Sequence, residues 1–189
     1  GALARDLLIE HIYDGDQQRA TADVDFAMIA ENWETHDHLT QQLMENHGYS
    51  LLIPPHKFIS ADKPPIMVDI LPFGGIERNR KVSLPPKHEF IVNMSGFKEA
   101  YENCIQVRLD DKVTIKIPSL AAYTVLKFFA WSDKGMEESK HVKDLSYLLN
   151  NYYFLDMEFI VMNYPDLQNG AFEEISPRAL GRKVQTMLI

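Results

Sequence analysis

The sequence predicts a mixed α/β fold of the α+β type, in which a sheet with flanking helices is followed by a C-terminal helical module. Up to residue 117 the pattern is one of short apolar or alternating runs, which is typical of strands. After Pro118 the apolar spacing becomes helical. The chain has 189 residues, of which 46% are hydrophobic, so it can bury the core of a globular domain.

The first part, 1–117, is expected to mix helices with strands. Apolar residues at helical spacing open the chain, and a Gly and Pro-rich stretch lies in its middle. The expected elements, in order, are a helix at 2–13, a strand at 21–29, a helix at 33–46 ended by Gly48, strands at 49–53, 57–60 and 66–71, a loop from Pro72 to His88, and strands at 90–93, 105–109 and 113–117.

The second part, 118–189, is expected to be helical. Ser119 is a suitable N-cap for a helix at 120–131, and a second helix is expected at 137–150. The remainder, 155–189, predicts one or two weaker helices broken by Pro165 and Pro177. Since Pro118 is not flanked by flexible linker composition, we expect the helical module to pack on the first part.

Composition excludes several classes of protein. The net charge of −8 disfavours a non-specific nucleic-acid coat, which needs a positive surface. No apolar run approaches the roughly 20 residues that cross a bilayer, and no secretory leader opens the sequence. The single cysteine rules out an internal disulfide framework and fits a reducing compartment. A cytoplasmic protein without a membrane partner is therefore expected.

Two aspartates on one strand are the most informative feature. In a strand, side chains two residues apart share a face, so Asp23 and Asp25 should project together, with Val24 and Phe26 turned toward the core. Neighbouring carboxylates repel each other, and a bound cation would relieve the repulsion. A solvent-facing strand edge with two acids explains this pair equally well.

Asp69 adds a third carboxylate. It lies in the run Ile66–Leu71, where every neighbour is apolar, and burying a lone carboxylate there is costly unless it is paired or bound to metal. If this strand lies beside the first one, three carboxylates converge as ligands for one or two Mg²⁺ ions. The alternative is that Asp69 pairs with an arginine or lysine.

These residues resemble the motifs of a known family. Gly1-Ala2, then Asp23-Val24-Asp25-Phe26 and Val68-Asp69-Ile70-Leu71, are similar in order to the nucleotidyltransferase AbiEii toxin family, within the DNA polymerase beta-like nucleotidyltransferase superfamily. The segments around Lys127 and Lys143-Asp144 also resemble its helical half. The resemblance covers about residues 1–150 and implies a nucleotidyltransferase fold.

The resemblance also implies a reaction and its residues. Asp23, Asp25 and Asp69 would be the catalytic and metal-binding carboxylates, with Mg²⁺ as cofactor and a nucleoside triphosphate as substrate. The acceptor would be the hydroxyl of an RNA such as tRNA, or of a protein, and the chain would be the toxin of a toxin–antitoxin pair. Residues expected to contact the triphosphate are Gly1, Ala2, Arg5, Lys127 and Lys143.

Other readings remain open. Ala2 stands where the family has Gly or Ser, which favours a catalytically weak module that binds nucleotide or metal. A metal-dependent nuclease would use the same carboxylates. Arg78, Arg80 and Lys81 form a short basic cluster that could meet an RNA acceptor or be a solvated loop. His36 and His38 lie two apart on the expected helix and do not share a face, so they form no metal-spaced pair, and both are expected at the surface.

Overall fold

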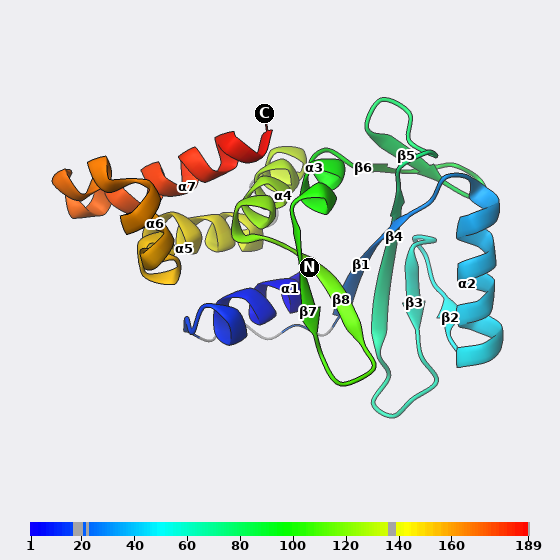
Figure 1. Ribbon diagram of the computed structural model, residues 1–189. Coiled ribbons are helices and arrows are strands. Elements are labelled where there is room, and N and C mark those ends of the chain that lie inside the picture. Colours follow the sequence, from blue (N-terminus) through cyan, green and yellow to red (C-terminus); the bar gives the residue numbers. More distant parts are fainter. Residues whose placement is uncertain (17–20, 22, 136–138, 189) are drawn as a thin grey trace. The chain divides into compact units, whose positions relative to one another are not determined.

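The computed structural model describes residues 1–16, 21, 23–135 and 139–188 and has a mixed α+β fold with C-terminal helices, as the sequence predicts (Figure 1). The chain forms two compact units. Unit 1 contains Gly1–Leu3 and Gln18–Lys98, and unit 2 contains Ala4–Gln17 and Glu99–Ile189. The division falls after Lys98, whereas the sequence placed it at 117, so the strands between these positions belong with the helices.

Unit 1 is built on a four-stranded mixed sheet with the order β1-β4-β3-β2. Strand β1 pairs in parallel with β4, while β3 pairs antiparallel with both β4 and β2. The strands are β1 (Asp23–Ile29), β2 (Ser50–Leu51), β3 (Lys57–Ile59) and β4 (Met67–Phe73). The strands expected at 21–29, 49–53, 57–60 and 66–71 are thus confirmed, with shifted ends.

Strand β4 continues where the sequence predicted a loop. It runs through Pro72 to Phe73, although proline cannot donate a ladder hydrogen bond. The backbone N–H of Ile70 donates toward the β3 side, to the His56 carbonyl. The nitrogen of Pro72, two residues later, faces the same side but lies beyond Lys57, where β3 begins, so the missing N–H leaves no ladder bond to β3 unmade.

The predicted loop also contains a strand. Strand β5 (Lys81–Leu84) pairs antiparallel with β6 (Phe90–Asn93), which corrects the loop expected over 72–88. Val82 and Leu84 of β5 are fully buried. Their alternation with Lys81 and Ser83 is the period-two pattern of a strand, but only four residues long.

Helix α2 (Trp33–His47) packs against the sheet of unit 1 (Figure 1). The Asn32 side chain accepts a hydrogen bond from the Thr35 N–H and caps its start, and Gly48, at φ 67°, ends it in the left-handed conformation. Leu43 and Met44 contact a buried cluster on β3 and β4, made of Phe58, Val68 and Ile70. A second cluster joins Ala30 and Phe73 to β5.

Unit 2 is mainly helical. Its strands β7 (Cys104–Arg108) and β8 (Thr114–Pro118) form an antiparallel hairpin. The Asp110 carboxylate accepts from the N–H groups of Lys112 and Val113 at the turn. The helices are α4 (Leu120–Lys134), α5 (Ser139–Leu155), α6 (Met157–Asn163), η3 (Pro165–Asn169) and α7 (Phe172–Leu188), and two short helices, α1 (Ala2–Asp6) and α3 (Phe97–Glu102), cross the division between the units.

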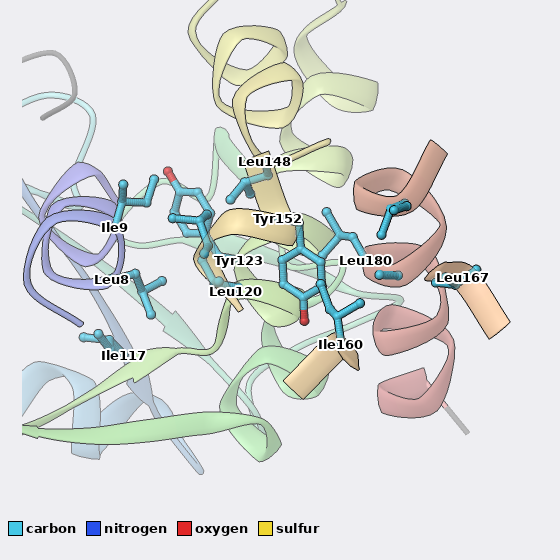
Figure 2. Packing of buried hydrophobic residues seen from close by; sticks show 13 residues of the cluster. Leu8, Ile9, Ile117, Leu120, Tyr123, Leu148, Tyr152, Ile160, Leu167 and Leu180 are labelled. Carbon is cyan, nitrogen blue, oxygen red and sulfur yellow. The ribbon is translucent and has the colours of Figure 1, made fainter. Parts of the chain in front are cut away.

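The core of unit 2 joins the start of the chain to its second half. Leu8 and Ile9, from the π-helical turn η1 (Leu7–Ile12), lie in the same cluster as Tyr123, Leu148 and residues of α7 (Figure 2). Leu8, Leu148 and Ile160 are fully buried. This cluster explains why the helix predicted at 2–13 belongs with the helical unit.

The proline-based break at Pro177 is wrong, whereas the one at Pro165 is confirmed. Helix α7 runs through Pro177, its sixth residue, where the proline removes one helical hydrogen bond. The adjacent Ser176 hydroxyl accepts from the Tyr153 N–H at 2.9 Å and donates to the Asn150 carbonyl at 3.3 Å. Packing and these bonds to α5 hold the helix across the proline.

Among the residues that the structure describes, no helix has the length and apolar character needed to traverse a bilayer.

Candidate functional site

Strands β1 and β4 bring the three predicted carboxylates together. In their parallel register Asp25 lies directly opposite Asp69, and Asp23 lies two residues before Asp25 on the same face. One oxygen from each of Asp23, Asp25 and Asp69 lies within 4.8 Å of the others. The convergence expected from the sequence is therefore confirmed.

The two aspartates of β1 are the accessible side of this cluster. Asp23 is partly exposed, and its Oδ1 accepts a hydrogen bond from the Thr21 hydroxyl at 2.6 Å. The Asp25 side chain is 36% exposed, and its Oδ2 lies 3.9 Å from the Gly1 nitrogen. Both carboxylates keep oxygen atoms open to solvent or to a ligand.

Asp69 is the buried member. Its side chain is 11% exposed, and its Oδ2 accepts from the Lys57 ammonium at 2.5 Å, with His56 Nε2 at 3.9 Å. Lys57 is the direct cross-strand neighbour of Asp69 on β3. Asp69 therefore pairs with a lysine, as the alternative interpretation predicted, and also belongs to the carboxylate cluster.

The other oxygen of Asp69 has no such partner. Asp69 Oδ1 is buried and makes no hydrogen bond with any residue that the structure describes. A buried carboxylate oxygen left unpaired is costly, and a cation beside it would remove that cost. A set of carboxylate oxygens, one of which is buried without a hydrogen bond, fits a hard divalent ion such as Mg²⁺.

The expected inward position of Phe26 is wrong. Its side chain is 47% exposed, although it shares a face with the buried Ile70 of β4. Strand β1 is an edge strand, and the buried cluster behind this sheet is centred on β3 and β4. Alternation predicts which face a residue lies on, but not whether another layer covers that face.

Gly1 and Ala2 lie next to the carboxylates. Ala2 begins α1, and a Cβ atom at position 1 would collide with the Asp25 carboxylate. Only glycine allows the backbone to approach Asp25 this closely. The turn that the sequence assigned to triphosphate binding therefore lies at the carboxylate site of unit 1.

The predicted basic contacts lie in unit 2, and two of them pair with acidic residues there. Arg5 is fully buried and forms ion pairs with Asp6, at 2.6 Å, and with Asp144, at 3.7 Å. Asp144 is also buried and accepts from Lys127 Nζ at 2.8 Å and from the Tyr123 hydroxyl at 3.0 Å.

The remaining predicted contact, Lys143, is exposed on α5. Asp144, the residue after it, faces the interior of the unit, so the Lys143-Asp144 pair presents one charge to solvent and one to the buried ion pairs.

Unit 1 contains a cavity of about 690 Å³ beyond the carboxyl ends of β1 and β4. Arg78 and Lys81, from the predicted basic cluster, line it together with Trp33 and His88. The ring centroids of Trp33 and His88 lie 6.1 Å apart, edge to face. The cavity thus combines cationic and aromatic groups, the pair of features that single-stranded nucleic acids contact.

His36 corrects a further expectation. It is 5% exposed rather than at the surface, and its ring meets that of Trp33 at a centroid distance of 5.4 Å. His38, two residues along α2, is exposed as expected. Residues two apart lie on different helix faces, so the rule separates the two histidines but does not say which one faces inward.

Lys57 and His56 are the residues of this site that the sequence did not reveal. The strand at 57–60 was expected, but its pairing with β4 was not. The available signal was a lysine opening a short strand that comes just before the strand of Asp69. Assigning an antiparallel hairpin to these two strands would have placed Lys57 near Asp69.

Comparison with known proteins identifies no relative: no family model matches the chain, and neither a curated protein nor a solved structure is significantly similar to it.

Proposed function

We propose that this chain is a cytoplasmic, magnesium-dependent nucleotidyltransferase that moves a nucleoside monophosphate from a nucleoside triphosphate to an acceptor hydroxyl. The observation that carries the proposal is the convergence of Asp23, Asp25 and Asp69 within 4.8 Å, from two parallel strands. The order of these residues is also the one that resembles the AbiEii toxin family.

The carboxylates have distinct tasks in this proposal. Asp23 and Asp25, which are the more accessible, would hold the ion that carries the triphosphate, and Asp69 would contribute Oδ1 from the buried side. A bound Mg²⁺ supplies charge neutralisation on the phosphate oxygens. Gly1 lies next to Asp25, where its backbone would contact a phosphate held by the ion.

In the proposed reaction, one bond to the α-phosphorus forms and another breaks. The acceptor oxygen bonds to the α-phosphorus, the bond to the β-phosphate oxygen breaks, and pyrophosphate leaves with that electron pair. Asp69 would take the proton of the acceptor hydroxyl as the general base, a role that the family resemblance implies. The same residue thus assists both metal binding and proton transfer.

The acceptor we propose is an RNA such as tRNA. Arg78, Lys81 and Trp33 favour a nucleic-acid acceptor, because they line a cavity of the same unit, which lies beyond the carboxyl ends of β1 and β4 while the carboxylates lie toward the amino ends. A protein acceptor is the alternative that the family resemblance also implies. An antitoxin partner follows only from the family resemblance.

The test is transfer of label from α-³²P-labelled triphosphates to cellular RNA in the presence of Mg²⁺. We expect labelled RNA with the unmodified chain and none with Asp25→Ala. Asp62→Ala is the matched control, because Asp62 is an exposed aspartate of unit 1 outside the cluster. Undiminished labelling by Asp25→Ala would refute the proposal.

Two other outcomes would indicate a different function for the same carboxylates. RNA that is shortened without added triphosphate, in an Asp25-dependent way, would identify a metal-dependent nuclease. Triphosphate binding by calorimetry, without transfer to RNA or protein, would identify a binding module.

A further inference from the structure

Lys57 introduces a positive charge into a site that is otherwise acidic. Asp23, Asp25 and Asp69 carry three negative charges, and the Lys57 ammonium lies 2.5 Å from Asp69 Oδ2. His56 adds charge only when it is protonated. With His56 neutral, the four charged side chains sum to −2, which a single divalent ion balances.

The two oxygens of Asp69 are not equivalent. Oδ2 accepts from Lys57, while Oδ1 is buried without a hydrogen bond to the described residues. A divalent ion that binds Oδ1 would lie close to the ammonium and be repelled by it. Lysine and metal are therefore competitors for the same carboxylate, rather than independent neighbours.

Lys57 also has a role before any ion binds. Without it, the buried Asp69 would face two other carboxylates with no lysine ammonium beside it, which favours displacement of its side chain. Lys57 is held in register opposite Asp69 by the β3–β4 ladder, so the compensation is built into the sheet.

We propose that Lys57 is the built-in countercation of the carboxylate site: it holds Asp69 in place in the metal-free protein, competes with the divalent ion and limits the site to one such ion. This inference rests on the proposed function only through its metal site. A second ion would have to arrive with its own negative charge, as the complex of a divalent ion with triphosphate does.

The test is titration of the full chain with Mn²⁺, without nucleotide, followed by calorimetry and by the electron paramagnetic resonance signal of free Mn²⁺. We expect one ion per chain. Removing the charge in Lys57→Met should lower the dissociation constant about tenfold or more, because a positive charge next to the ion is lost. Lys57→Arg, which keeps the charge, should bind like the unmodified chain.

Lys87→Met is the matched control, since Lys87 is an exposed lysine of unit 1 away from the cluster. Thermal unfolding provides a second readout. Metal-free Lys57→Met should melt below the unmodified chain, and Mn²⁺ should raise its melting temperature more than it raises that of the unmodified chain.

A measurement on the unmodified chain covers the case in which Lys57→Met does not fold. Acetylation of Lys57, followed by mass spectrometry, should rise when Mn²⁺ is added, because the ion releases the ammonium from Asp69. Acetylation of exposed Lys87 should not change.

Two bound ions, unchanged or weaker affinity in folded Lys57→Met, or Lys57 acetylation insensitive to bound Mn²⁺ would each overturn the inference. These results would leave the proposed function standing, since the site would still bind metal. No Mn²⁺ binding at all would instead remove the metal site on which both proposals depend.

Discussion

Asp144 compensates the buried cations of unit 2. It accepts from Lys127 and Tyr123 and lies 3.7 Å from Arg5. Asp144→Ala leaves buried positive charge uncompensated, so we expect it to lower the free energy of unfolding by about 3–5 kcal/mol. Urea denaturation followed by circular dichroism measures this loss.

The control for Asp144 is Asp111→Ala, at an exposed turn of the same unit. It should change the stability by less than about 0.5 kcal/mol. Equal losses in the two variants would mean that Asp144 contributes no more than a surface charge.

Asp156 should make stability depend on pH. Burial raises the pKa of its carboxyl above 3.8, and the hydrogen bond from the Tyr152 hydroxyl opposes this only in part. The folded protein therefore holds this proton more tightly than the unfolded chain. The resulting stabilisation is present below 3.8 and is lost as pH rises through the folded pKa.

Asp156→Asn removes that titration and keeps an acceptor for Tyr152. We expect it to be at least as stable as the unmodified chain at neutral pH, with an advantage that shrinks as pH falls toward 3.8. Urea denaturation of both proteins across this range tests it. An advantage that grows toward acid would contradict the assigned direction of the shift.

At the scale of single elements, Gly75 and Gly181 differ in the space that surrounds their Cα atoms. A Cβ at Gly75, after β4, would collide with the backbone of Glu31, whereas one at Gly181, inside α7, would meet nothing within 4 Å. Gly75→Ala should therefore destabilise the protein, by about 1–3 kcal/mol. Gly181→Ala should stabilise it by about 0.5–1 kcal/mol, because alanine loses less entropy in a helix.

Unfolding free energies of the two alanine variants, measured side by side, test this contrast. Since both replace glycine by alanine, each serves as the control for the other. If Gly75→Ala stabilised the protein, the segments around Gly75 and Glu31 would move apart without a cost in folding free energy.

The sequence predicted the helices and strands better than it predicted which strands pair and which helices pack together. Asp23, Asp25 and Asp69 could be found because carboxylates in strands are unfavourable and therefore conspicuous. Lys57 could not, because its role depends on the pairing of β3 with β4. Pro177 misled because intrinsic helix propensity was outweighed by the packing of α7 on α5.

At the scale of the whole molecule, the two units have separate cores, and each contains one of the two tryptophans. Trp33 belongs to unit 1 and Trp131 to unit 2. Leu148→Ala, in the core of unit 2, should cost about 2–5 kcal/mol there. We expect the unfolding midpoint reported by Trp131 to fall more than the one reported by Trp33.

Trp33→Phe leaves Trp131 as the fluorescent tryptophan, and Trp131→Phe leaves Trp33. Measuring unfolding by fluorescence in each variant, with and without Leu148→Ala, gives a separate midpoint for each unit. Equal shifts of both midpoints would show that the units unfold as one cooperative block.

The way the chain passes between the units has a consequence for its synthesis. Leu8 and Ile9 emerge from the ribosome before all of unit 1 beyond Leu3, yet the other buried residues of their cluster come from Ile117 onward, among them Tyr123, Leu148 and residues of α7. The sheet strands of unit 1 have their partners within one continuous stretch, Gln18–Lys98, and can assemble while translation continues. The first helical turns instead gain their buried neighbours only after the carboxyl-terminal helices have been made.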